Sequence, residues 1–218
     1  MDKKLLNQQS QHWENNFSSK PEMFGLEPSY SAKKSLEIFK KYNIKKILEL
    51  GSGLGRDTIY FAKNNIKVHA LDFSPCAINI INKKSKKLGL DKFITTEIFD
   101  IRKDFSFIEK NFDGCYSHML YCMALTESEL ESLNYKINLK LKEDGINIYT
   151  VRNTSDGDFQ KGSHIGEDLY EMNGFIVHFF SDEKIKKLLN GYKNLEIIRF
   201  DEGNFPRRLS MVINQKTS

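Results

Sequence analysis

Three glycines at alternate positions follow a short apolar run near residue 50, and a carboxylate lies inside that run. The segment reads ILELGSGLGRDTIYFA over residues 47–62, where Glu49 precedes Gly51, Gly53 and Gly55. Gly51 and Gly53 tolerate positive φ and leave no Cβ between the backbone and a ligand, and Gly55 is expected to bring the next helix close to the strand. The pattern predicts a ligand site beyond the carboxyl end of a strand.

The acid and the spacing indicate which ligand this turn would bind. A dinucleotide turn, GxGxxG, needs its third glycine where Arg56 stands, and a carboxylate beside helix N–H groups would oppose a pyrophosphate. Glu49 instead favours a ligand with positive charge. S-adenosylmethionine (SAM) carries a sulfonium and an ammonium, so we favour SAM over NAD.

From Glu49 to Gly55 the chain resembles the first motif of the class I SAM-dependent methyltransferases, acid-x-Gly-x-Gly-x-Gly, at every fixed position. The resemblance implies methyl transfer from SAM and cofactor contacts at the ends of successive strands. Those contacts are Glu49, Gly51, Ser52, Gly53, Gly55, Arg56, Asp72, Phe73, Asp100, Ile101, Ser117 and His118.

The resemblance also implies a role for several of these residues. Asp72 ends a predicted strand and would accept the ribose hydroxyls, with a helix-capping acid as the alternative. Asp100 would receive the adenine amine, with Ile101 or Phe73 against the ring. Backbone at Ser117 and the residue after it would line the methionine part of the cofactor.

Two of the residues keep alternative roles. Arg56 would bind the cofactor carboxylate or lie on the surface of the first helical turn. His118 would act as a base, and is the one candidate for a catalytic residue, or would satisfy buried backbone groups. Methyl transfer needs a base only when the acceptor must lose a proton.

The layout of the chain is similar to small-molecule methyltransferases of the tellurite-resistance and thiopurine type, which carry an aromatic N-terminal segment over the cofactor. This resemblance implies a small-molecule acceptor, for example a thiol or a chalcogen or metalloid oxyanion. Side chains expected around the acceptor are Phe24, Tyr30, Tyr121, Arg152, Asn153, His164, Arg207 and Arg208.

Apolar runs alternate with segments of helical period, which predicts a Rossmann-like α/β fold with helices on both faces of a sheet of about seven strands, mostly parallel with the last strand antiparallel. We expect one domain over residues 1–218, with an N-terminal arm or lid at 1–31, irregular over residues 10–31, and the body at 32–218. Strands are predicted at 46–50, 67–72, 93–99, 112–118, 145–151, 195–200 and 209–214. Helices are predicted at 31–42, 57–64, after Ser74-Pro75, after Thr126 and after Ser181. Residues 152–180 show little periodicity.

Composition limits the other classes of function. The chain has 218 residues, 39% of them hydrophobic, and a net charge of +4 from dispersed lysines, which does not favour a nucleic-acid surface. Its three cysteines cannot all pair and show no metal-binding spacing, so we interpret them as small buried groups in a reducing compartment. We therefore expect a cytoplasmic, metal-free enzyme with no membrane or nucleic-acid partner and leave its oligomeric state open.

Two other functions are compatible with the same first motif. A methyltransferase acting on protein or nucleic acid would keep the same first motif, but the residues after the fourth strand, SHMLYC, lack the motif typical of base amino-group methylation. A non-catalytic SAM-binding protein would keep the glycine turn without an acceptor cavity.

Overall fold

The computed structural model describes residues 3–106, 108–203 and 207–217, with the side chains of the first helix described from Gln8 onward. Part of the predicted connection between the last two strands, residues 204–206, lies outside the described residues. No helix in the described part of the chain is both long and apolar enough to cross a bilayer.

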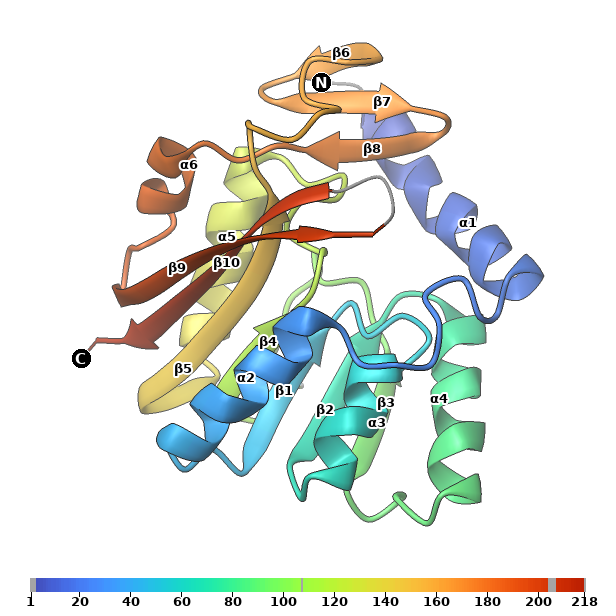
Figure 1. Cartoon of the computed structure of the whole chain (residues 1–218), viewed down its shortest axis with the longest axis vertical. Coiled ribbons are helices and arrows are strands. Elements are labelled where there is room, and N and C mark those ends of the chain that lie inside the picture. The colour runs from blue at the N-terminus through green and yellow to red at the C-terminus, as the bar shows by residue number, and fades with distance from the viewer. Residues whose placement is uncertain (1–2, 107, 204–206, 218) are drawn as a thin grey trace.

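Seven strands form the main sheet, in the order β3-β2-β1-β4-β5-β10-β9 (Figure 1). Strands β1 to β5 pair in parallel, and β10 runs antiparallel between β5 and β9. This confirms the predicted Rossmann-like topology, including the antiparallel last strand. The bounds are β1 Lys46–Leu50, β2 Lys67–Asp72, β3 Ile94–Ile98, β4 Phe112–Ser117, β5 Leu141–Arg152, β9 Tyr192–Glu202 and β10 Arg207–Lys216.

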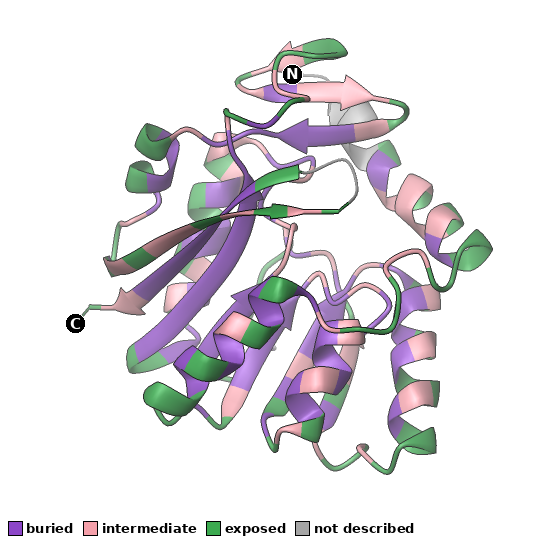
Figure 2. Ribbon diagram, viewed as in Figure 1, coloured by how far each residue is buried: buried purple, intermediate pink, exposed green. Residues whose placement is uncertain are grey.

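Helices cover both faces of this sheet, as the alternation of apolar runs predicts. Apolar residues of α2 and α3 share one buried cluster with β1 and β4, while α5 and the end of α6 pack on the opposite face (Figure 2). The bounds are α1 Lys3–Ser19, α2 Tyr30–Lys41, α3 Arg56–Lys63, α4 Pro75–Lys87, α5 Glu127–Asn138 and α6 Asp182–Lys187.

Local capping signals begin three of these helices where the sequence predicts. The Ser74 hydroxyl accepts the Ala77 N–H ahead of α4, with Pro75 in the first turn. Thr126 and Glu129 form both hydrogen bonds of a capping box ahead of α5, and the Ser181 hydroxyl caps α6. Each cap depends on residues three positions apart, so local sequence is enough to predict it.

The N-terminal arm is helical up to Ser19, so the expectation of an irregular segment over residues 10–31 is wrong for residues 10–19. Trp13 and Phe17, four residues apart, lie on the same side of α1 and pack in one cluster with Phe24 and Leu54. The arm aromatics do pack on the body, as expected, because Phe17 is buried.

The segment 152–180, for which the sequence predicted no element, contains a small antiparallel sheet. Its strands are β6 Ser163–Gly166, β7 Leu169–Met172 and β8 Phe175–His178. Four-residue strands are too short to show a clear period, which explains why they were missed. Figure 1 shows this sheet above the main sheet, with α1 running from it toward α4. The Gln9 side chain ties α1 to β8, since it donates to the Gly174 carbonyl and accepts the Ile176 N–H.

Candidate cofactor and acceptor site

The glycine turn after β1 has positive φ at the two glycines where the sequence allows it, 66° at Gly51 and 50° at Gly53. Gly55 also has a positive φ, 79°, which the sequence did not indicate. A Cβ on Gly55 would lie 2.5 Å from Cγ1 of Ile81 in α4. Gly55 therefore permits a close approach of helix to helix, rather than the helix-to-strand approach expected from the sequence.

Asp72 lies at the end of β2 and is buried beside this turn. Its Oδ2 accepts the Gly53 N–H at 2.8 Å, and its Oδ1 accepts the Ser74 N–H at 2.9 Å. Burial raises the pKa of Asp72 to about 6, although these two hydrogen bonds oppose the rise. The carboxylate thus lies where the resemblance places the ribose hydroxyls and also holds the glycine turn in place.

Several buried polar atoms lie at the ends of the two central strands, where Leu50 of β1 pairs with Ser117 of β4. Among the described residues, no hydrogen-bond partner faces Oε2 of Glu49, Oγ of Ser52 or Oγ of Ser117. Burial raises the pKa of Glu49 well above its usual range; the nearby Thr58 side chain opposes the rise, and the nearby acids add to it. A buried acid with one free oxygen gains a partner when a cationic ligand group arrives.

The predicted adenine contacts follow β3 in a turn that a lysine holds. Asp100 accepts two-pronged hydrogen bonds from the Arg102 guanidinium, which lower its pKa despite partial burial. The Lys136 ammonium of α5 donates to three carbonyls of this turn, those of residues 101–103, at 2.9 to 3.2 Å. Ile101 is buried and Phe73 is partly buried. The sequence did not indicate the role of Lys136, since it lies on a different element.

Helix α1 reaches the glycine turn and the start of α4. The Phe17 ring comes within 3.8 Å of the position that a Cβ on Gly53 would take. The Glu14 carboxylate accepts a short hydrogen bond from the Ser74 hydroxyl and faces the Cys76 N–H at 3.5 Å. A negative charge is favourable at this helix N-terminus. Sequence analysis missed Glu14, because no local pattern marks a carboxylate that caps a helix distant in sequence.

Arg56 connects α3 with the arm and with the C-terminal hairpin. Its guanidinium donates to the Phe24 carbonyl at 2.9 Å, lies over the Phe24 ring, and stands 3.6 Å from the Glu202 carboxylate. The Arg56 side chain is only partly exposed and has partners from two other segments, which favours the site role over the surface alternative.

His118, directly after β4, is the centre of the polar contacts at this edge of the sheet. Its Nδ1 lies 2.9 Å from the hydroxyl oxygens of Ser31 and Thr150. Its Nε2 lies 3.3 Å from Arg56 and 3.3 Å from Oε2 of Glu202. Of these partners, Arg56 was expected in the site but the other three were not, because they come from α2, β5 and β9.

Comparisons with known proteins agree with this geometry. Residues 47–145 match the family model of a methyltransferase domain. Over these residues, a little under half of the chain, the sequence is similar to methyltransferase domains, in agreement with the resemblance of the first motif. The match includes the glycine turn, Asp72, Asp100 and His118. No curated protein gives a significant match.

Solved structures share the fold of the methyltransferase at low sequence identity. The 1,6-didemethyltoxoflavin-N1-methyltransferase of Burkholderia thailandensis, solved with 1,6-didemethyltoxoflavin and S-adenosylhomocysteine, has a TM-score of 0.74 at 16% identity, covering 96% of this chain and 87% of its own. TehB of Haemophilus influenzae has a TM-score of 0.68 at 18% identity, covering 94% and 67%. A SAM-dependent methyltransferase of Clostridium acetobutylicum has a TM-score of 0.70 at 15% identity, covering 94% and 99%.

Some of the expected acceptor residues of the methyltransferase come to the site. Phe24 lies against Arg56, and Arg207 pairs in register with Glu202 at the end of the hairpin where β9 connects to β10. His118 and the positive charges of Arg56 and Arg207 lower the pKa of Glu202, although burial alone would raise it. These residues therefore form one charged group around the end of β4.

Other expected acceptor residues have structural partners elsewhere. Tyr121 is fully buried and stacks on Tyr149 with ring centroids 4.2 Å apart, so its assignment to the acceptor cleft is wrong. The Arg152 guanidinium is buried in ion pairs with two aspartates, Asp156 and Asp158. The remaining side chains also contact neighbours: Tyr30 packs on Phe200, Asn153 bonds Ser155 and Ser210, His164 bonds the Glu167 carbonyl, and Arg208 bonds the Ser155 carbonyl.

The cysteines do not assemble into a thiolate cage. Cys115 and Cys122 are buried, Cys76 is partly buried, and none forms a disulfide. Burial raises the pKa of Cys122 to about 11 and that of Cys115 further, so both stay protonated at neutral pH. Their interpretation as small buried groups fits this arrangement.

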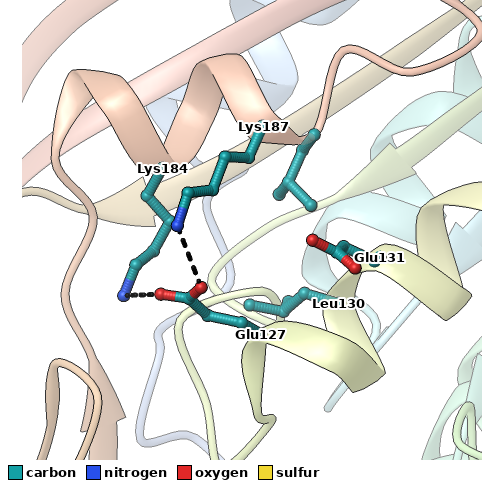
Figure 3. Close-up of a pocket in the computed structure, with 6 residues that line it drawn as sticks. Glu127, Leu130, Glu131, Lys184 and Lys187 are labelled. Carbon is teal, nitrogen blue, oxygen red and sulfur yellow. Dashed lines mark hydrogen bonds and ion pairs between the residues drawn. The ribbon is translucent and has the colours of Figure 1, made fainter.

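A second polar cluster joins α5, α6 and the small sheet. Figure 3 shows Lys184 and Lys187 pointing toward Glu127. The Nζ atoms of Lys184 and Lys187 lie 3.2 and 3.3 Å from the two carboxylate oxygens of Glu127. The Lys184 Nζ also lies 2.6 Å from Nε2 of His178. Burial and the positive charge of Lys184 lower the pKa of His178 to about 4. Glu127, Glu167 and His178 are close enough to hold a cation, but the lysine already supplies a positive charge among them. We interpret this cluster as a structural link.

Proposed function

We propose that the chain transfers a methyl group from SAM to a small molecule bound between the arm, the end of β4 and the β9–β10 hairpin. The observation that carries this proposal is the environment of His118. Ser31 of α2 contacts its Nδ1 and Glu202 of β9 contacts its Nε2, so segments from both ends of the chain meet there. The acceptor position then lies under cover, and we propose that residues 1–31 act as a lid on the body at 32–218.

This cover favours a small acceptor over a macromolecule. The His118 side chain is 12% exposed, and the arm holds Arg56 through the Phe24 carbonyl. A base or a residue of a folded partner would have to displace these contacts to reach the end of β4. We propose accordingly that nucleic acid is not a partner and, from the free thiols, that the enzyme works in the cytoplasm.

The residues of the site fit SAM. Bound SAM supplies an electrophilic methyl group on a sulfonium. The free Oε2 of Glu49 suits the ammonium of SAM, and the buried carboxylate of Asp72 suits the ribose hydroxyls. At Gly53 the nearest side chain, Phe17, stays 3.8 Å from the position of a Cβ, which supports close approach of a ligand to this part of the turn. Hydrogen bonds from Lys136 hold the turn that follows Asp100, and we propose Asp100 and Ile101 as the adenine contacts.

The charges around the acceptor position bear on the acceptor itself. Arginines around an acceptor favour an anion, and the resemblance to tellurite-resistance enzymes implies oxyanions among the possible acceptors. Arg56 lies 3.8 Å from the Asp57 carboxylate and 3.6 Å from the Glu202 carboxylate, so its positive charge is balanced by acids. This balance supports an acceptor without a full negative charge, and the oxyanions belong in the assay as the competing possibility.

Calorimetry and turnover test the proposal in two steps. We expect SAM and S-adenosylhomocysteine to bind and NADH not to bind. We then expect S-adenosylhomocysteine to form with at least one member of a panel of small amines, phenols, heterocyclic N–H compounds, thiols, selenite and tellurite. Asp72→Ala should lose both signals, while Asp91→Ala, at an exposed acid between α4 and β3, should keep them. Binding of SAM without turnover of any member, combined with methylation of a protein or RNA fraction, would overturn the small-molecule proposal.

A further inference from the structure

The two nitrogens of His118 each face a pair of groups that accommodates either protonation state. At Nε2, the Glu202 carboxylate can only accept a hydrogen bond and the Arg56 guanidinium can only donate one, and both lie at 3.3 Å. At Nδ1, the hydroxyls of Ser31 and Thr150 can each donate or accept. An imidazole in this setting can gain or lose a proton without leaving a nitrogen unpaired.

We propose that His118 is the general base of the methyltransferase, with Glu202 as its positioning residue, and that the acceptor is a neutral N–H or O–H compound. This proposal rests on the proposed function and makes its acceptor class specific. A protonated Nε2 pairs with Glu202, and a neutral Nε2 accepts from Arg56. The structure thus provides a partner for the imidazole before and after proton transfer.

The reaction step balances with these residues. The lone pair of the acceptor nitrogen or oxygen forms the bond to the methyl carbon, and the carbon–sulfur bond breaks with its electron pair remaining on sulfur. The acceptor proton passes to Nε2 of His118, where Glu202 stabilises the positive imidazolium. A thiolate or oxyanion would have no proton to give, so it would not require this arrangement.

Hydrogen bonds on the Nδ1 side fix the orientation of the ring. The Ser31 hydroxyl also contacts the Tyr116 hydroxyl at 2.9 Å, and Tyr116 donates to the buried carboxylate of Asp57 at 2.8 Å. Thr150 accepts the Met119 N–H at 2.9 Å. These fixed partners hold Nδ1 against the protein and direct Nε2 to the side where Arg56 and Glu202 meet.

The charged groups around the imidazole predict how it titrates. Arg56 of α3 and Glu202 of β9 face it directly, and Arg207 of β10 acts through Glu202. Removing the carboxylate destabilises the imidazolium, and removing the guanidinium stabilises it. We expect the NMR titration midpoint of His118 to be lower in Glu202→Gln than in wild type, and higher in Arg56→Gln.

The NMR experiment needs no knowledge of the acceptor. The Cε1–H resonance of His118 is assigned by its loss in His118→Asn, and Glu196→Gln, at an exposed acid of the same strand, is the control that should leave the midpoint in place. Midpoints that stay fixed, or that move the same way in Glu202→Gln and Arg56→Gln, would show that these groups do not flank a titrating base.

Turnover then tests the acceptor class. With an N–H or O–H acceptor, we expect His118→Asn to lower kcat by roughly 100- to 10,000-fold while SAM binding persists. We expect the acid limb of kcat/KM to move to lower pH in Glu202→Gln but not in Glu196→Gln. Turnover confined to thiols or oxyanions, at rates unaffected by His118→Asn, would overturn this proposal and leave the proposed function standing. No turnover with any panel member would count against the proposed function, while the titration would still decide the role of the pair.

Discussion

The backbone N–H of Gly53 donates a hydrogen bond to Oδ2 of Asp72 at 2.8 Å. This bond joins the glycine turn after β1 to the end of β2, so the groups proposed for the methionine and ribose parts of SAM are fixed relative to each other. Asp72 is therefore a structural as well as a binding residue, and its protonation should affect both properties.

Protonation of Asp72 predicts the pH dependence of SAM binding. Ribose hydroxyls bond more strongly to a carboxylate than to a neutral acid, and the pKa of Asp72 is about 6 because the group is buried. Affinity for SAM should rise as the pH increases through about 6. At pH 8, Asp72→Asn should bind roughly 10- to 100-fold more weakly, and its affinity should depend less on pH. Calorimetry at several pH values measures this, with Asp91→Asn as the control.

Ionisation of Asp72 should also change the stability of the ligand-free protein. This stability should fall as the pH rises, whereas the affinity for SAM should increase. The pKa of Asp72 is higher in the folded chain than in the unfolded chain, so the folded state binds this proton more tightly. The stabilising contribution of Asp72 is full below about pH 4 and is lost as the pH rises from about 4 to about 6. In urea unfolding, wild type should lose more stability than Asp72→Asn over this interval; equal losses would contradict the assignment.

Two glycines offer a matched test of close packing at the turn. Gly55 has φ of 79° and a Cβ there would meet Ile81 at 2.5 Å, whereas Gly89 has φ of 66° and nothing within 4 Å. Gly89→Ala should lower the free energy of unfolding by about 1–2 kcal/mol through backbone strain alone. Gly55→Ala should lower it by about 2–4 kcal/mol, because overpacking adds to the strain. Chemical denaturation distinguishes them, and similar losses would argue against the helix contact.

Glu14 should hold α1 over the site through Ser74. Glu14→Gln removes the charge that accepts the Ser74 hydroxyl at the start of α4, so α1 should detach more often. We expect faster hydrogen exchange in residues 8–19 and earlier cleavage within the arm by a protease. Glu22→Gln, at an exposed acid of the same arm, is the control. Unchanged exchange in Glu14→Gln would mean that the aromatic contacts alone hold the helix.

Lys136 of α5 should hold the turn of residues 101–103, next to Asp100, which we propose as an adenine contact. Lys136→Met keeps the unbranched apolar part of the side chain but leaves the carbonyls of residues 101–103 without their donor. Loss of these hydrogen bonds should reduce stability by about 1–3 kcal/mol and weaken SAM binding. Thermal unfolding and calorimetry measure the two effects, and Lys83→Met on the exposed side of α4 serves as the control. A variant with lower stability but unchanged affinity would separate Lys136 from the cofactor site.

Features that depend on neighbouring residues were correctly predicted from the sequence. The strands β1, β2 and β4, the caps at Ser74 and Thr126, and the positive φ values at the first two glycines of the turn all follow from spacing within a few positions. The family resemblance rests on the same short segment, and the match over residues 47–145 confirms it. Local steric and hydrogen-bonding preferences are enough to determine such features.

Contacts between distant segments were decided only by the tertiary structure. Helix α1 and the small sheet gain their stability by packing on each other, which no local period reveals. His118 meets Glu202, Glu14 meets Ser74 and Tyr121 enters the core because folding brings separate elements together. The sequence determined the cofactor motif, since one turn and the strand ends carry it. The acceptor side depends on packing among α2, α3, β5 and β9, whose relative positions only the assembled fold defines.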